Sequence, residues 1–349
     1  MKKTLVALAV LAAGSAQAGI EIYNQDKVTV NLKGDIEVVY LKGTDADAEF
    51  QQEIQDADFG FDTRYAINDD LQFGGFWEFK GSSTDTQSGN AYVGLYSQAA
   101  GSIIFGRLDS ILDDAGIGSD YQFGLNSFFS NGSPFGADES VRYDIDKGSF
   151  YGGIAYKQDK NGSTDLGKDG SMVDAKIGAR VADFDFTGFY GQGDFKGEGA
   201  HLGGRPDEKP ANTDKLEGKE TLWALEARWA AMQNLNLELG YYNISLDATS
   251  LNGTPIDGSL TNNTLGLAAD YTIEKFVIAG GVSQSKYDEA IQIGSTGDSY
   301  DKVTNWFINA GYAVAPGATA YVEVGGDDGY NDNGDKNGTG VAVGVKAEF

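Results

Sequence analysis

The chain contains no cysteine and, among its 349 residues, only one histidine and five prolines. The absence of cysteine excludes disulfide bonds, thiol catalysis and cysteine-based metal sites. Acid–base catalysis by histidine could use only His201, which lies in a stretch rich in glycine, proline and charge. A lone loop histidine is usually a solvent-exposed side chain, so the residue types favour a protein without catalytic machinery.

Long hydrophobic runs are also missing, because no stretch approaches the roughly 18 apolar residues that a transmembrane helix needs. The chain starts with Lys2 and Lys3, continues with an apolar run from Leu5 to Ala13, and then reads Ala-Gln-Ala at 16–18. This order is typical of a secretory signal peptide. We expect residues 1–18 to be this signal, removed after Ala18, and residues 19–349 to form one exported domain.

Positive charge is scarce: 26 basic residues stand against 52 acidic ones, which gives a formal charge of −26. A field of this sign repels nucleic acid and favours cations nearby. Solubility alone could also account for acidic loops, so the position of the acids along the chain matters more than their number.

Alternation of apolar and polar residues is present along most of the chain. In the last run Val341, Val343 and Val345 share one face, whereas Lys346 and Glu348 share the other. Successive side chains of a β-strand point to opposite faces. We count sixteen such runs, at about 28–42, 55–67, 70–80, 90–97, 101–107, 139–146, 149–158, 171–182, 185–195, 219–231, 234–247, 261–273, 275–288, 302–314, 318–327 and 338–349.

The connections between these runs alternate in length. Short turns are expected at 68–69, 146–148, 183–184, 233–234 and 315–317, and long loops at 43–54, 108–138, 159–170, 197–218, 248–260, 289–301 and 328–337. Short turns at one end and long loops at the other are typical of an all-β, up-and-down antiparallel transmembrane barrel. Sixteen strands enclose a water-filled channel, whereas eight would be filled by their own side chains.

The polar face carries charges on one run after another. Parity places the basic residues Lys33, Arg64 and Lys80 on this face, together with the wall acids Asp35, Glu37, Asp58, Asp62, Glu78 and Glu238. The apolar core of a soluble sandwich could not hold so many charges, because burying an unpaired charge is very costly. A water-filled lumen can hold them, so we expect these side chains to line the pore.

The connection 108–138 is the longest and contains many apolar residues that a solvated loop would not need. Long loops with their own packing are usually functional. We expect this connection, the third long loop, to fold into the lumen and narrow it. Its acids would then give the constriction a negative charge: Asp109, Asp113, Asp114, Asp120, Asp138 and Glu139.

The whole of 19–349 resembles the general trimeric porins of Gram-negative outer membranes, and more particularly their marine γ-proteobacterial, vibrio-type branch. The resemblance rests on Ile-Tyr-Asn at 22–24, Phe-Gly-Phe at 59–61, Ile-Asn-Asp-Asp-Leu at 67–71, Phe-Gly-Arg at 105–107 and the terminal Phe349. It implies a homotrimer, location in the outer membrane, and contact with outer-membrane lipid and lipopolysaccharide. It also implies that Phe349 is an assembly signal for the barrel-assembly machinery, and that no cofactor is needed.

The family also implies a cluster of basic residues on the wall opposite the third loop. Lys33 matches the basic residue of the family's first strand, and Arg142 matches that of the sixth. The second-strand arginine falls on Asp58 instead, and the fourth-strand arginine falls near Gly89 or Asn90. Half of the basic wall is therefore missing, which indicates a channel that prefers cations among small hydrophilic solutes and ions.

Three alternatives remain open. A channel selective for oligosaccharides would use lumen-facing aromatics, for which Phe76, Tyr92 and Tyr96 have the right parity. A barrel that does not conduct, such as an adhesin or a membrane enzyme, is the second. The third is a calcium site in 327–338, but the twelfth position of the pattern, with Asn333 as the first, is Gly344 rather than glutamate, so we expect an exposed loop and no metal.

Overall fold

The computed structural model describes residues 19–82, 85–127, 136–162, 164–202, 215–292, 299–331 and 334–349. The predicted signal peptide at 1–18 lies outside the described residues. No helix among the described residues is long and apolar enough to cross a membrane. The only helical element there is one turn of 3₁₀ helix, η2 (Ile111–Asp114).

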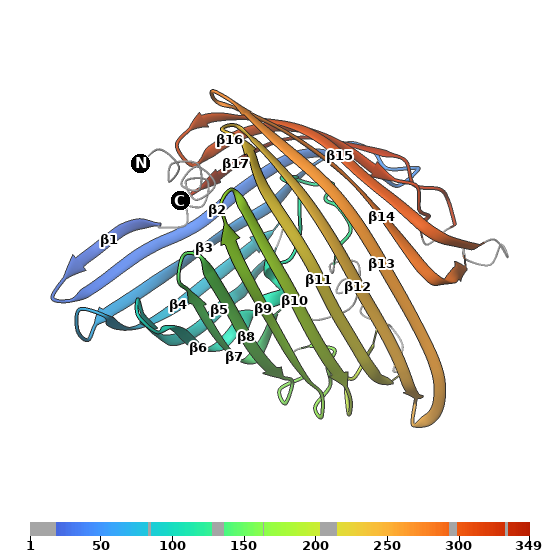
Figure 1. Ribbon diagram of the computed structural model, residues 1–349, viewed down its shortest axis with the longest axis horizontal. Coiled ribbons are helices and arrows are strands. Elements are labelled where there is room, and N and C mark those ends of the chain that lie inside the picture. The colour runs from blue at the N-terminus through green and yellow to red at the C-terminus, as the bar shows by residue number, and fades with distance from the viewer. Residues whose placement is uncertain are drawn as a thin grey trace.

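The strands form one antiparallel sheet that closes on itself (Figure 1). In chain order they are β1 (Ile20–Gln25), β2 (Val28–Lys42), β3 (Gln51–Ala66), β4 (Leu71–Ser82), β5 (Asp85–Ser97), β6 (Gly101–Asp109), β7 (Gly136–Asp146), β8 (Phe150–Gln158), β9 (Ser171–Val181), β10 (Phe184–Phe195), β11 (Leu216–Met232), β12 (Leu235–Leu251), β13 (Thr254–Ile273), β14 (Phe276–Gln292), β15 (Ser299–Ala315), β16 (Ala318–Asp327) and β17 (Thr339–Glu348). Each strand from β2 to β17 pairs with the next, and β17 pairs with β2. The predicted sixteen-stranded antiparallel barrel is thus confirmed.

β1 is an additional short strand that the sequence pattern did not predict. It pairs with β2 over Val28–Leu32, whereas β17 pairs with the same edge of β2 over Asp35–Lys42. β1 and β17 therefore share one edge of β2 end to end. β1 extends the wall below the end of β17, at the left of Figure 1.

One predicted loop is wrong. The connection 248–260 is not a long loop, because β12 and β13 run on to a tight turn at Asn252 and Gly253. Both turn residues have positive φ, 51° and 78°. Asn-Gly is the residue pair that favours such a two-residue turn between twisted strands. The polar residues on either side concealed two long strands, of 17 and 20 residues.

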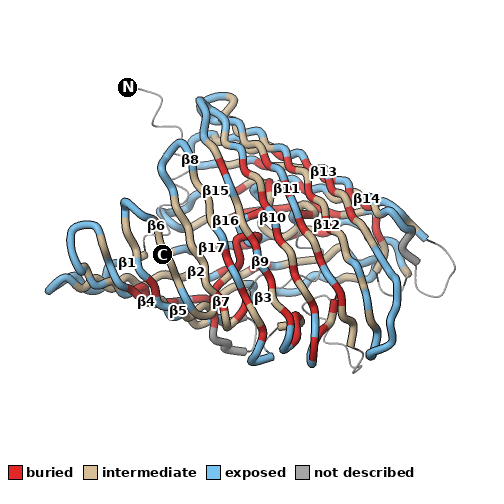
Figure 2. Tube along the Cα trace, turned by 60° about the horizontal axis from the view of Figure 1, so that its bottom comes forward, coloured by how far each residue is buried: buried red, intermediate tan, exposed pale blue. Residues whose placement is uncertain are grey.

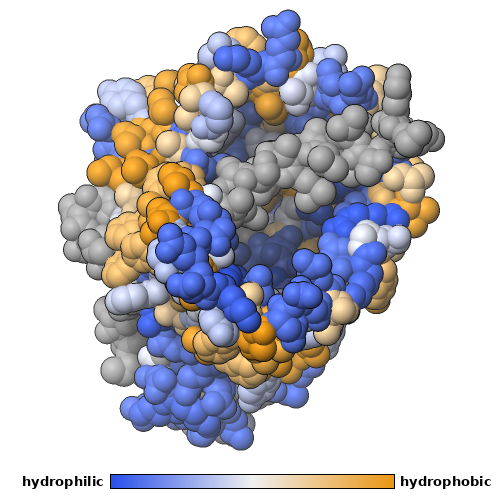
Figure 3. Space-filling view, turned by 90° about the vertical axis from the view of Figure 1, so that its left-hand side faces the viewer, coloured by the Kyte–Doolittle hydropathy of each residue, from blue (hydrophilic) through white to orange (hydrophobic). Residues whose placement is uncertain are grey.

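The outer and inner faces of the barrel differ as the alternation predicts. Phe59, Phe61, Val343 and Val345 are all more than one-third exposed, whereas Asp58 and Asp62, which flank the two phenylalanines, are buried. The alternation of buried and exposed positions runs along the strands in Figure 2. Figure 3 shows hydrophobic residues on the outer side and a hollow edged by hydrophilic residues.

The inner wall is not polar everywhere, which departs from the sequence prediction. Along β8–β12 it carries buried apolar side chains, among them Phe189, Leu222 and Tyr242. Leu166, from the loop between β8 and β9, and Leu202, from the loop between β10 and β11, pack on them in one cluster with Ile111 and Leu112 of η2. Apolar inner positions are found here because loop side chains cover them from within the ring of strands.

Candidate functional site

The candidate site is built around residues 110–127, which we call the inner segment. It starts with η2, whose first turn is capped by the Ser110 hydroxyl, which accepts a hydrogen bond from the backbone N–H of Leu112 at 3.1 Å. The N–H of Ile111 donates to Asp174 of β9 at 2.6 Å, and Arg142 of β7 donates to the Ser110 carbonyl at 3.1 Å. Asp174 is itself paired with the buried Lys157 at 3.3 Å. These contacts attach the start of the inner segment to β7–β9.

The middle of the inner segment is held by two glutamates of neighbouring strands. The N–H of Gly116 donates to Glu226 of β11 at 2.6 Å, and the N–H of Gly118 donates to Glu238 of β12 at 3.0 Å. Arg228 lies between these carboxylates, 2.9 Å from Glu226 and 3.6 Å from Glu238, and also donates to the carbonyl of Gly116. The arginine therefore offsets the charge of both glutamates.

Three successive N–H groups of the inner segment converge on one buried carboxylate, Glu323 of β16. Tyr121, Gln122 and Phe123 donate to it at 2.7, 2.8 and 2.5 Å. The side-chain amide of Asn309 adds a fourth bond at 2.8 Å. Charge-assisted hydrogen bonds of this kind are among the strongest in proteins, so Glu323 is the strongest single attachment of the segment.

The end of the inner segment is bound by neutral polar groups. Asn126 donates to the hydroxyls of Ser283 and Ser285 on β14, both at 3.1 Å, and to the side-chain oxygen of Asn305 on β15 at 2.7 Å. On the opposite side, the Gln122 amide donates to Glu37 of β2 at 2.8 Å. The segment thus contacts inward-facing side chains of strands spread around the ring, from β9 through β16 to β2.

Three of the six acids predicted in the third loop do lie in the inner segment: Asp113, Asp114 and Asp120. The other three lie in strands, because β6 runs to Asp109 and β7 starts at Gly136. Asp109 accepts from Asn90 at 2.5 Å, and Asp138 is paired with Arg107. The prediction placed these strand ends wrongly because glycine and acidic residues around them weaken the alternation.

Glu139 was predicted to be an acid of the third loop that narrows the pore, and the structure corrects this prediction. Its carboxylate accepts hydrogen bonds from the backbone N–H groups of Lys160 and Asn161, in the loop after β8. It caps that loop rather than extending from the inner segment. No signal in the sequence separates it from its neighbour Asp138.

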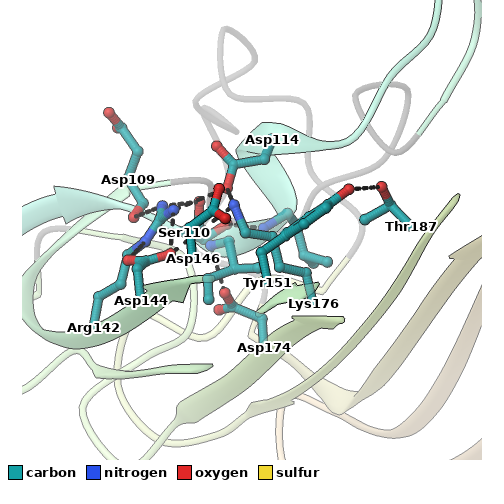
Figure 4. Close-up of polar contacts among 12 residues, drawn as sticks. Asp109, Ser110, Asp114, Arg142, Asp144, Asp146, Tyr151, Asp174, Lys176 and Thr187 are labelled. Carbon is teal, nitrogen blue, oxygen red and sulfur yellow. Dashed lines mark hydrogen bonds and ion pairs between the residues drawn. The ribbon is translucent and has the colours of Figure 1, made fainter. Parts of the chain in front are cut away.

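Asp114 and Asp144 form an ion-pair cluster with two basic residues of the wall (Figure 4). Asp114 lies 2.8 Å from Arg142 and 2.5 Å from Lys176. Asp144 lies 2.7 Å from Arg142 and 3.9 Å from Lys176. The charges of this cluster balance, two against two. Lys176 was not predicted as a wall residue, although the alternation of β9 would have identified its parity.

Asp113 and Asp120 differ from Asp114 in having no cationic partner among the described residues. Both are exposed. Partial burial of the carboxyl group, together with the negative charges of Asp109 and Asp114, raises the pKa of Asp113 to about 6. Partial burial also raises the pKa of Asp120. Asp113 is therefore charged at neutral pH and loses its charge in mild acid.

The predicted basic residue Lys33 is paired with Asp62 at 3.1 Å, and Asp62 also binds Arg64. Glu78 accepts from the N–H of Asn90 at 2.8 Å and lies 3.8 Å from Lys80. Most of the basic wall residues therefore sit beside one or two carboxylates. Of the predicted wall acids, Glu37 and Glu238 accept hydrogen bonds from the inner segment, and Glu238 is also paired with Arg228.

Asp35 and Asp58 approach a third acid, Asp56, which was not among the predicted wall residues. Their carboxylate oxygens all lie within 4.8 Å of one another. Lys346 lies 3.6 Å from Asp35, and Lys80 lies 3.9 Å from Asp58. Two ammonium groups thus already offset part of this charge.

The lone histidine does not form a catalytic arrangement among the described residues. The N–H of His201 donates to the carbonyl of Asp165 at 2.9 Å, and its Nδ1 is buried without a hydrogen-bond partner. The residues that sequence reasoning missed are the attachments of the inner segment, chiefly Asp174, Glu226 and Glu323. The alternation along their strands could have predicted that these side chains face inward, but not which groups they bind.

A closed sixteen-stranded barrel with an apolar outer face and a charged interior defines an outer-membrane channel protein. The chain matches the family model described as Gram-negative porin over residues 4–345, and it belongs to that family. The predicted family and the predicted location in the outer membrane are both confirmed.

Among curated proteins, the chain is similar to porin-like protein H of Photobacterium profundum, with 34% identity over 198 residues. This match covers 56% of the chain and 59% of the relative, so it spans little more than half the length of either. The major outer membrane protein of Pasteurella multocida is 25% identical over 343 residues, which cover 89% of the chain and 93% of that protein.

Among solved structures, a loop-deletion mutant of OmpT, an outer membrane protein of Vibrio cholerae, superposes with a TM-score of 0.74. The two sequences are 20% identical, and the superposition covers 93% of this chain and 100% of the OmpT mutant. Salmonella typhi OmpF in complex with daunomycin gives a TM-score of 0.71 at 18% identity, over 94% and 100% of the two chains. At these identities the likeness establishes the fold.

Proposed function

We propose that this porin is a passive diffusion channel for small hydrophilic solutes and ions, that it prefers cations, and that it catalyses no reaction. The observation that carries the preference is the imbalance of partners in the interior. Lys33, Arg142 and Lys176 are each held by a carboxylate, whereas Asp113 and Asp120 have no cationic partner among the described residues. Unpaired acids in a pore select cations.

The inner segment is the proposed constriction. Support comes from its hydrogen bonds to inward side chains of β9, β11, β12 and β16, which lie at different places around the ring. A chain attached in this way crosses the open cross-section, and its exposed acids then lie where permeating ions are most confined. Low-dielectric walls focus the field of such charges on the ion.

An oligosaccharide channel is less well supported, although Phe76, Tyr92 and Tyr96 are lumen-facing by parity. The guanidinium of Arg64 lies 3.3 Å from the centre of the Tyr96 ring and covers that face. Phe76 and Tyr92 pack on each other, with ring centres 5.5 Å apart. A sugar needs open aromatic faces, and here they are engaged by other side chains.

We further propose that the protein assembles as a homotrimer and contacts outer-membrane lipid and lipopolysaccharide. Support comes from the family and from a related structure, 19% identical, of the Vibrio cholerae protein OmpT in a trimer form. Its biogenesis would use the barrel-assembly machinery, with Phe349 as the signal.

Planar-bilayer recording of the purified protein tests the whole proposal. We expect stepwise conductance. Under a salt gradient we expect a reversal potential whose sign shows that cations permeate more readily than anions. A protein that inserts without conducting would refute the channel. An anion-side potential at low salt would refute the charge assignment and leave the channel intact.

A further inference from the structure

The apolar side chains of the inner segment meet the barrel wall at glycines. A Cβ atom added to Gly153 would lie 2.7 Å from Cδ1 of Ile111, and one added to Gly191 would lie 2.7 Å from Cδ1 of Leu112. Real Cβ atoms essentially never approach a neighbour this closely. The glycines at these two positions therefore provide the room that the segment occupies.

The same relation continues along the inner segment. An added Cβ would lie 2.8 Å from Leu125 at Gly281 and 3.1 Å from Ile117 at Gly266, and it would overlap Tyr121 at Gly311. Phe123 lies against two such positions, Gly325 and Gly340. The complete set, which we call the wall glycines, is Gly153, Gly191, Gly266, Gly281, Gly311, Gly325 and Gly340, on seven strands from β8 to β17.

Backbone conformation does not explain the wall glycines. None of them has a positive φ, so any residue could adopt their strand geometry. Glycine inside a strand is otherwise unfavourable, by roughly 0.5–1 kcal/mol relative to alanine, because of its greater loss of conformational freedom. Glycine in a strand often marks the close approach of another group, and the inner segment is such a group at each of the wall glycines. At Gly153 and Gly281 the wall side chains Asp144 and Phe307 also approach, at 2.7 and 2.9 Å from the added Cβ.

We propose that the wall glycines are specificity-determining residues of the channel, because they set how deeply the inner segment sits in the wall and hence how much cross-section stays open. This inference rests on the proposed function and adds the residues that fix the pore width. Gly340 is the sharpest case. The ring of Phe123 covers its Cα and packs with the buried Val39 and Ala342.

The backbone N–H of Phe123 donates to Glu323 at 2.5 Å, which restricts movement of this residue along the wall. Carbon atoms in contact prefer a separation of about 3.5–4.0 Å. A methyl group on Gly340 therefore pushes the Phe123 ring, and the segment with it, away from the wall and into the open cross-section. Conductance falls, and larger solutes lose more than small ones.

The experiment compares single-channel conductance and the permeation of neutral solutes of graded size for Gly340→Ala and Gly188→Ala. Gly188 is the matched control, because its added Cβ would find its nearest neighbour, Leu225 Cδ2, at an ordinary 3.6 Å. We expect a loss of conductance and a smaller size limit in Gly340→Ala and neither change in Gly188→Ala. Equal behaviour of the two variants in a conducting wild-type background overturns the inference.

A double variant separates the loop from the sheet, because the carbonyl of Lys42 also lies 3.0 Å from the added Cβ at Gly340. In a Phe123→Ala background we expect Gly340→Ala to cause no further loss of conductance. A loss that persists without the ring places the effect in the strands and overturns the inference. A wild-type protein that does not conduct refutes the proposed function instead.

Gly311 gives an independent pair in case Gly340→Ala does not fold. Its added Cβ would overlap the Tyr121 hydroxyl, while the next neighbours lie at 3.2 Å or more. We expect Gly311→Ala to reduce conductance and Tyr121→Phe to restore it, since that change removes the hydroxyl alone. No restoration, with both proteins folded, overturns the role of Gly311.

Discussion

Phe349, the last residue, exchanges two backbone hydrogen bonds with Gly34 of β2. The N–H of Gly34 donates to the Phe349 carbonyl at 2.8 Å, and the N–H of Phe349 donates to the Gly34 carbonyl at 2.9 Å. This pair completes the seam between β17 and β2 at the point where β1 takes over the edge of β2. Phe349 is thus part of the closure of the barrel.

Deletion of Phe349 should impair insertion into the outer membrane strongly, because it removes both seam bonds and the terminal aromatic residue. Replacing Asn337, in the loop before β17, should have little effect. The amount of each variant in outer-membrane fractions measures this. Equal amounts of the two variants would remove Phe349 from the assembly argument.

Neutralising acids of the constriction should weaken the cation preference. We expect Asp113→Asn to shift the reversal potential toward zero, and Asp113→Asn combined with Asp114→Asn to shift it further. Lys33→Gln should shift it the other way, because Asp62 loses one of its two partners. All shifts should shrink as salt rises, since the Debye length falls from about 8 Å at physiological salt to about 3 Å at 1 M. An unchanged potential in the double variant would contradict the charge assignment.

Cation preference should also depend on pH. The pKa of Asp113 is raised to about 6, so this carboxylate is charged above that pH and becomes protonated as the pH falls through it. We therefore expect weaker cation preference on acidification from neutral pH, measured as reversal potential against pH. Asp113→Asn should lack the part of the titration centred near pH 6. A titration identical to that of the wild type would assign the effect to other acids.

Trimer assembly should appear as conductance that closes in three equal steps, and as a change of gel mobility on heating. The heated protein should lose its β-rich circular dichroism at the same temperature. Closure in a single step would indicate that one isolated barrel is the conducting unit.

Removing the Glu323 carboxylate should loosen the inner segment. In Glu323→Gln the amide presents one acceptor oxygen to four donors, and a buried donor left unpaired costs about 1–3 kcal/mol. We expect noisier channel currents and lower thermal stability in detergent. Asp70→Asn, on a short turn outside the barrel interior, is the control for stability. Quiet currents in Glu323→Gln would show that the remaining contacts suffice.

The sequence by itself determined the class of fold. Strict alternation in runs such as 338–349, together with connections of alternating length, required an antiparallel sheet with one apolar face. The charges at Asp58, Asp62 and Glu78 then required water on the other face, because an apolar core cannot hold them. These features are local, with a period of two residues, and they can therefore be recognised without knowledge of the tertiary structure.

Only the tertiary structure decided which charges remain unpaired and what holds the inner segment. Glu323 meets Tyr121–Phe123 across about 200 residues of sequence, and Asp114 meets Lys176 across 62. Parity predicts that a side chain faces inward, but not which group it meets there. The role of Gly340 could not be predicted from the sequence either, because this glycine leaves space for a ring from a distant part of the chain.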